Sequence, residues 1–246
     1  MSVLVLPLAG PLQSWGASAR FARRGTENAP TKSGVVGLLA AALGLNRDAD
    51  EQLAELAALR FAVRLDQPGT RIRDFQTAHH FDTDEAMPLS ERFYLADAVF
   101  LAAVEGGDAL IDRLAAALRA PAYLPYLGRR SCPPARPLEP AVHHGGAGVE
   151  QVLAGEPWQA AHWYQKRRSH QERVPLTLLI EARAADGEPE PLGDTLRDQP
   201  LSFDPRHRRY ALRTVHTRTV TVANPHASPR QKPAPAHDPT GHLEGV

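Results

Sequence analysis

The chain has a single cysteine, Cys132, in 246 residues. One thiol cannot form an internal disulfide, and it cannot supply the several thiolates of a cysteine-based metal site. Lysine is also scarce, occurring only at positions 32, 166 and 232, so arginine makes up nearly all of the 28 basic residues. A GC-rich genome would account for this bias, but arginine is also the side chain that pairs with phosphates through two nitrogens and stacks on bases. The placement of the arginines has to decide between the two explanations.

An excess of charge and long apolar runs are absent as well. The formal net charge is zero, which argues against a protein that coats nucleic acid without discrimination. No apolar stretch approaches the roughly 20 residues that a membrane helix needs. The apolar N-terminal run has no basic leader and is interrupted by Pro7, so it predicts a strand and not a signal peptide. We therefore expect a cytoplasmic protein without membrane contact.

Hydrophobic patterning predicts an α+β fold. Alternating or continuous apolar residues predict strands at 2–9, 60–66, 93–104 and 174–183. Apolar residues at helical spacing predict helices at 31–44, 48–59 and 107–121. The order strand, helix, strand, strand, helix, strand is that of a ferredoxin-like domain.

Two stretches stand outside this order. Residues 67–91 separate two strands that a ferredoxin-like domain joins by a tight turn, and they interleave arginine with aromatic residues. That mixture suits single-stranded RNA, whose bases stack on rings while arginine meets phosphates, but a disordered surface loop has the same composition. Residues 224–246 are rich in proline, which predicts a disordered tail after a domain that spans 1–223.

Lys32 and Ser33 open a predicted helix, as they do in a nucleotide-binding phosphate loop. That loop needs a glycine directly before the lysine, where this chain has Thr31, so we exclude a nucleoside triphosphatase. The amides at the start of the helix still form a potential anion site, although Thr31 and Ser33 could equally be ordinary capping residues.

A second basic motif is PYLGRRSCPP at 125–134, in which prolines bracket a turn that presents Arg129 and Arg130 beside Tyr126. A solvated surface turn is the simpler interpretation. Cys132 has no base close to it in the sequence, which favours a packed thiol over a nucleophile. The adjacent histidine pairs at 79–80 and 143–144 lack the spacing of metal ligands, so we predict neither a metal site nor a cofactor.

Taken together, four stretches resemble one protein family. They are LAGPLQSWG (8–16), PTKSGVVGLLAAALG (30–44), IRDFQT (72–77) and YLPYLGRRSCPPARPL (123–138). In this order they are similar to the CasD family, the 5′-handle-binding subunits of type I-E CRISPR Cascade complexes, within the RAMP superfamily. The similarity is close over residues 1–140 and only general over 141–246.

The resemblance implies a ferredoxin-like (RRM-like) domain with a β-hairpin thumb inserted at about 67–91 and an additional C-terminal β-rich portion. It implies a non-catalytic subunit that binds the 5′ handle of crRNA, contacts the backbone subunit CasC and the large subunit CasA, and meets target DNA through the assembled complex. The RNA-binding residues that it implies are Gln13, Trp15, Arg20, Arg24, Lys32, Ser33, Arg73, Tyr126, Arg129 and Arg130, with Trp15 or Tyr126 stacking on a base.

Two other functions remain open. A related CRISPR subtype uses its member of this family to cut the precursor RNA, so a metal-independent endoribonuclease that processes repeat RNA is one alternative, with His79, His80 and Lys32 as the candidate groups. The arginines could instead pair only with acidic residues of neighbouring proteins.

Overall fold

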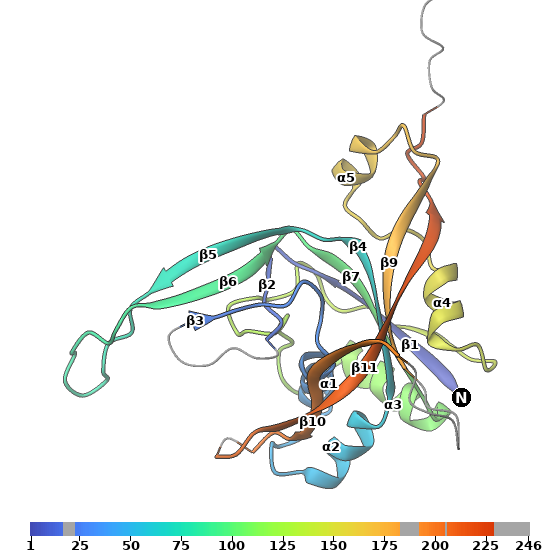
Figure 1. Cartoon of the computed structure of the whole chain (residues 1–246). Helices are drawn as coiled ribbons and strands as arrows, with labels where there is room; N and C mark the ends of the chain where they lie inside the picture. Colours follow the sequence, from blue (N-terminus) through green and yellow to red (C-terminus); the bar gives the residue numbers. More distant parts are fainter. Residues whose placement is uncertain (17–22, 183–191, 205, 229–246) are drawn as a thin grey trace, which may run out of the picture.

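The computed structural model describes residues 1–16, 23–182, 192–204 and 206–228, which form an α+β fold with two sheets (Figure 1). The larger sheet has the strand order β10-β11-β9-β4-β7-β1-β8, and each pair of neighbours is antiparallel. Its strands are β1 (Ser2–Ala9), β4 (Arg60–Gln67), β7 (Val99–Gly106), β8 (Ala141–His143), β9 (Arg173–Glu181), β10 (Asp194–Ser202) and β11 (Arg209–Ala223). The smaller sheet is formed by β2 (Leu12–Gln13), β3 (Arg23–Arg24), β5 (Thr70–Gln76) and β6 (Ser90–Ala96).

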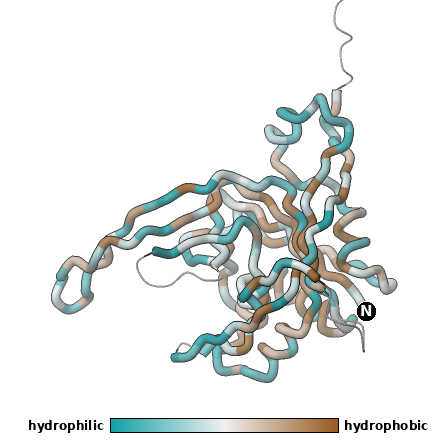
Figure 2. The backbone as a smooth tube through the Cα atoms, viewed as in Figure 1, coloured by the Kyte–Doolittle hydropathy of each residue, from teal (hydrophilic) through white to brown (hydrophobic). Residues whose placement is uncertain are grey.

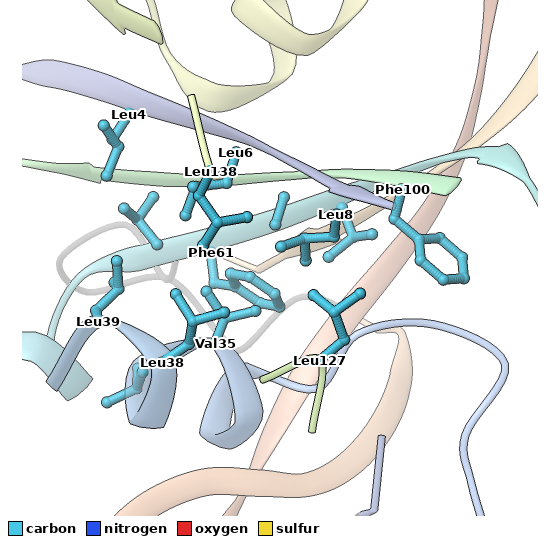
Figure 3. Close-up of a cluster of buried hydrophobic side chains, with 14 of the residues drawn as sticks. Leu4, Leu6, Leu8, Val35, Leu38, Leu39, Phe61, Phe100, Leu127 and Leu138 are labelled. Carbon is cyan, nitrogen blue, oxygen red and sulfur yellow. The ribbon is translucent and has the colours of Figure 1, made fainter. Parts of the chain in front are cut away.

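The core lies on both faces of the larger sheet because successive side chains of a strand point to opposite faces. Leu4, Leu6 and Leu8 of β1 pack on one face with the apolar side chains of α1 (Lys32–Ala42), α2 (Asp50–Ala57) and α3 (Asp108–Arg119) (Figure 3). Val3 and Val5 pack on the other face against α4 (Val149–Gly155). The apolar residues therefore concentrate where the strands cross beneath the helices, and the projecting β5–β6 hairpin is more polar (Figure 2).

The predicted helices are present, and their ends follow from local chemistry. The hydroxyl of Thr31 accepts a hydrogen bond from the Gly34 amide at 3.3 Å, which identifies Thr31 as the cap of α1. Gly44 follows that helix with a φ of +74°, a conformation that glycine adopts without steric cost. None of the helices in the described ranges is long and apolar enough to cross a membrane.

The structure has the β-hairpin that the resemblance implied for residues 67–91, but the single strand predicted at 93–104 is wrong. The chain turns at Asp97, whose φ is +56°, so residues 90–96 form β6 and residues 99–106 form β7. The strand β6 pairs with β5 over its whole length, and the two make a long hairpin that projects from the sheet (Figure 1). The stretch 67–91 is thus an ordered hairpin arm and not a disordered loop.

The C-terminal half adds four strands and two short helices, α4 and α5 (His162–Arg167). β9, the strand predicted at 174–183, lies beside β4, and the position beside β1 is taken by the three-residue β8, which the sequence did not predict. The predicted tail begins too early, because the Asn224 side chain donates to the carbonyls of Gln165 and Arg168 at 3.2 and 2.9 Å. Residues 229–246 of that tail lie outside the described residues.

A fully buried ion pair ties β4 to the segment after α4. The guanidinium of Arg64 donates to both carboxylate oxygens of Asp66 at 2.7 and 2.9 Å, and also to the carbonyls of Leu153, Glu156 and Pro157. Asp66 in turn accepts the Gln159 amide at 2.6 Å. Burial raises the pKa of Asp66, and the bonds from Arg64 act in the opposite direction.

We expect Arg64→Ala to lower the free energy of unfolding by about 3–5 kcal/mol, because it leaves a buried carboxylate and three carbonyls without their partner. The double variant Arg64→Met/Asp66→Leu should lose less than the single variant. In Arg64→Ala the pKa of folded Asp66 lies above its unfolded value, so stability should increase as the pH falls through that raised pKa. Urea unfolding at several pH values measures both effects. Equal losses in the single and double variants would contradict the first expectation, and stability in Arg64→Ala that does not rise as the pH falls would contradict the second.

Candidate nucleic-acid interface

Three segments that lie far apart in the sequence meet at the base of the hairpin. They are the described parts of one loop, 11–16 and 23–28, the hairpin 70–96 and the turn 125–132. The Ser14 amide donates to the Leu127 carbonyl at 3.0 Å, which joins the loop to the turn. The Arg71 guanidinium donates to the Thr26 carbonyl at 2.9 Å, which joins the hairpin to the loop.

Arg129 connects all three segments. Its guanidinium donates to the carbonyls of Arg24 and Gly25 at 2.8 and 3.2 Å and to the carbonyl of Phe93 at 3.3 Å. It also lies over the ring of Tyr94, 5.0 Å from its centroid. These bonds tie the turn to the loop and to the hairpin.

The turn approaches the loop so closely that only glycine fits at position 128. Gly128 has a φ of +91°, and a Cβ atom there would lie 1.7 Å from the Ser14 carbonyl oxygen. The turn is closed by the Leu127 amide, which donates to the Cys132 carbonyl at 2.7 Å. A glycine directly before the two arginines is therefore required by the close approach of the backbone to Ser14.

Gln13 and Trp15 do not line the surface where they were predicted. Both side chains have 0% of their area exposed. The Trp15 indole donates to the Gln13 side-chain oxygen at 3.0 Å, and the Gln13 amide donates to the carbonyls of Leu8 and Ala98 at 3.0 and 2.8 Å. The RNA contact predicted for these two residues does not fit this burial, and we assign them instead to holding the loop.

The start of α1 is also occupied by the protein itself. The Lys32 amide donates to a carboxylate oxygen of Asp198 at 2.7 Å, and the Lys32 ammonium binds both oxygens of Glu181 at 2.7 and 2.9 Å. Burial lowers the pKa of Lys32, and the Glu181 carboxylate opposes that shift. Ser33 is buried as well. The anion at this helix terminus is therefore Asp198, which leaves neither Lys32 nor Ser33 free for a phosphate in this structure.

The remaining predicted residues lie at the surface around Arg129. Arg24, Arg73 and Arg130 are exposed or largely so, and Tyr126 is 37% exposed. The predicted residue Arg20 lies outside the described residues. Figure 1 shows β3, β5 and β6 running alongside one another here, so residues of these strands share one region of the surface.

The sequence interpretation missed other members of this surface. Arg71 and Phe75 alternate with the predicted residue Arg73 along β5, so the three share one face, with Phe75 49% exposed. Arg23 lies 5.3 Å from the centroid of the Phe93 ring. The alternation of arginine with aromatic residues along the predicted hairpin was the signal that could have found Arg71 and Phe75. Glu91 pairs with both Arg23 and Arg73. Because one carboxylate faces two guanidinium groups, positive charge is in excess there.

The chemistry of this surface is binding chemistry. Guanidinium groups contact phosphates and exposed rings stack on bases, which together suit a single strand of nucleic acid. Cys132 has no exposed surface, and burial raises the pKa of its thiol, as expected for a packed residue. In the ranges that the structure describes, no cluster of three or more histidine, cysteine or acidic residues could hold a metal ion.

The chain belongs to the Cas5 family of CRISPR-associated proteins, whose family model, described as "CRISPR-associated protein (Cas_Cas5)", matches residues 3–216. It is similar to the CRISPR system Cascade subunit CasD of Escherichia coli K12, with 39% identity over 155 residues that cover 56% of this chain and 69% of that protein. The resemblance to the CasD family is thereby confirmed.

Two solved structures have the same fold. A chain described as "Crystal structure of Cas protein" is 34% identical with a TM-score of 0.65, and the match covers 92% of this chain and 97% of that one. A chain of a "CRISPR RNA-guided surveillance complex" is 32% identical with a TM-score of 0.70, and the match covers 92% and 93%. Both matches extend well beyond residue 140, where the sequence motifs end.

Cys132 provides a direct test of how the turn is docked. We expect it to react slowly with a thiol reagent in the native protein, since it is buried in the turn that Gly128 closes. Gly128→Ala should accelerate the reaction about tenfold or more, because a left-handed alanine alone costs about 1–2 kcal/mol and the Ser14 carbonyl must also move. Alkylation of this single thiol, followed by mass spectrometry, measures the rate.

Gly145→Ala is the matched control. Gly145 also has a positive φ, +105°, but nothing lies within 4 Å of a Cβ atom placed there. It therefore shares the backbone strain without the clash. Equal alkylation rates in the two variants would show that the close approach to Ser14 is not what holds the turn.

Proposed function

We propose that this chain is a non-catalytic subunit of a type I-E Cascade complex and that it holds the 5′ handle of the crRNA at the base of the hairpin. The observation that carries the proposal is the meeting of the three basic segments at Arg129. The Cascade membership of the CasD relative and the surveillance complex that contains a structural relative support the assignment. The handle would contact Arg24, Arg73 and Arg130, with Tyr126 or Phe75 as a stacking ring.

Under this proposal the fold is a ferredoxin-like domain of the RAMP type. The order β8-β1-β7-β4 places the last strand beside the first, and helices connect β1 to β4 and β7 to β8, as the ferredoxin-like arrangement requires. The β5–β6 hairpin is then the thumb, inserted between two core strands. β9, β10 and β11 form the additional C-terminal portion of one domain, which continues past residue 223 to include Asn224.

The hairpin tip has exposed apolar side chains, as a contact with a protein partner requires. Phe81 is 99%, Met87 48% and Leu89 56% exposed. Exposed apolar groups gathered in one place mark a protein contact. We propose that the tip folds over the guide against the backbone subunit CasC, that CasA contacts another face, and that target DNA is met through the assembled cytoplasmic complex.

The alternative, an endoribonuclease, has less support. Its candidate groups do not form one site: Lys32 is buried against Glu181, while the His79 ring lies in the hairpin tip, 3.0 Å from the Asp84 carbonyl oxygen. Figure 1 shows that tip far from α1. A general acid and base have to reach the same 2′-hydroxyl, which this arrangement does not provide.

We expect Arg73→Ala/Arg130→Ala to weaken binding of the handle in the assembled complex and to flatten its salt dependence. Each lost phosphate contact should reduce the slope of log K against log[salt] by about 0.7, so the double variant should lose about 1.4. Filter binding over a salt series measures both. Arg47→Ala/Arg113→Ala removes the same charge elsewhere on the surface and should change neither. An unchanged slope in the first variant would favour a protein-interaction module over an RNA-binding subunit.

We further expect no cleavage when the purified chain is incubated with repeat RNA in EDTA. Products that end in a 2′,3′-cyclic phosphate, and that disappear in His79→Ala or His80→Ala, would overturn the non-catalytic assignment. Denaturing gels with end-labelled RNA give the answer. The control Tyr123→Phe should behave as the unmodified chain does, and cleavage that is the same in every variant would come from a contaminating nuclease.

A further inference from the structure

A second group of basic and aromatic side chains lies on α5 (His162–Arg167), outside the interface at the hairpin. Trp163, Lys166 and Arg167 stand at positions i, i+3 and i+4 of this helix, so they share one face. All three are exposed, and Trp163 has 54% of its area accessible. The other two tryptophans, Trp15 and Trp158, are 0% and 4% exposed. Trp163 is therefore the one indole that faces solvent.

The exposure of Trp163 is imposed by the fold and does not come from a loose helix. Gln165, on the inner side of α5, donates to the carbonyls of Trp158 and Ala160, both at 2.9 Å. Trp158 donates to the Asp66 carbonyl at 2.9 Å, next to the buried pair of Arg64 and Asp66. A six-residue helix is unstable by itself, so these bonds hold α5 against the sheet and fix which face points outward.

Positive charge on this face is not neutralised. Residues 158–171 contain no acid at all. Lys166 and Arg167 form no ion pair with any residue in the described part of the chain, while Arg168 is turned away to lie over the Tyr164 ring, 4.7 Å from its centroid. The outward face thus consists of one ring and two unpaired cations.

We propose that this face is a second binding surface, which takes single-stranded nucleic acid by stacking a base on Trp163 while Lys166 and Arg167 contact the adjacent phosphates. A tryptophan that anchors a protein partner sits among other apolar contacts that exclude water. Trp163 is flanked instead by cations one helical turn away, the combination that single strands require. The surface is separate from the handle interface, and α5 lies away from the projecting hairpin (Figure 1).

Tryptophan fluorescence of the full chain tests the proposal, because only Trp163 is accessible to a ligand. Oligouridylate and oligodeoxythymidylate serve as probes, since neither contains the repeat sequence. We expect saturable quenching that weakens as salt increases. Trp163→Ala should lower the affinity about tenfold, measured by anisotropy of a labelled oligonucleotide, since stacking of one base contributes about 1–3 kcal/mol. Trp163→Tyr should recover part of the loss.

The charge contribution is tested by Lys166→Ala/Arg167→Ala, which should flatten the salt slope by about 1.4. The control Arg47→Ala/Arg113→Ala again removes the same charge from other surfaces. Binding of either probe supports the surface, and the probe that binds identifies whether the ligand is RNA, DNA or both. Absence of saturable quenching at low salt, equal slopes in the two double variants, or equal quenching by polyglutamate would overturn it.

The test of the α5 surface is independent of the handle proposal. Arg73→Ala/Arg130→Ala should leave the quenching of Trp163 by oligouridylate unchanged, and Trp163→Ala should leave the contribution of Arg73 and Arg130 to handle binding unchanged. Coupled losses in both assays would mean that α5 and the hairpin belong to one site, and this would contradict a separate surface.

Discussion

The burial of Trp15 is the constraint on which the rest of the interface depends. Its ring packs so closely against α1 that a Cβ atom on Gly34 would lie 2.8 Å from it. Its nitrogen donates to Gln13, which is itself anchored to β1 through the Leu8 carbonyl and to the residue before β7 through the Ala98 carbonyl. A buried aromatic ring with all its polar atoms paired is costly to move.

From this anchor the cationic surface is assembled largely by backbone groups. The loop that Trp15 fixes presents the carbonyls of Arg24 and Gly25, and these orient the guanidinium of Arg129. That guanidinium also reaches the hairpin at Phe93. Arginines held by carbonyls keep their charge, since a carbonyl does not neutralise a cation as a carboxylate does. The surface can therefore be both well ordered and positive in a protein whose formal net charge is zero.

Sequence patterns predicted the elements whose burial follows a regular period. The strand at the N-terminus and the helices α1 and α3 have such patterns, and each was found close to its predicted position. The break at Asp97 has no local signal, because a non-glycine residue with positive φ depends on the surrounding structure. The three residues of β8 are too few to show a period, and nothing in β9 itself indicates which strand it will lie beside.

The structure brings three of the predicted segments together, but it buries several of the side chains predicted within them. Lys32 has the residue type of a phosphate ligand, but its partners Glu181 and Asp198 lie 149 and 166 positions away in the sequence. Local inspection could not anticipate them. Glycine and arginine at 128–130 were more informative, because the steric demand of the turn and the charge of its side chains both act within a few residues.

The hairpin has a further property that concerns how related chains can diverge. Its tip, residues 77–89, is held by bonds within itself, such as that of the Met87 amide to the Ala78 carbonyl at 2.7 Å. Insertion of two residues in each strand would extend the arm by roughly 7 Å and keep every side chain on its original face. An odd number would exchange the two faces of everything beyond it. The hairpin can therefore lengthen by two residues per strand at a time during evolution, while the core of the larger sheet stays unchanged.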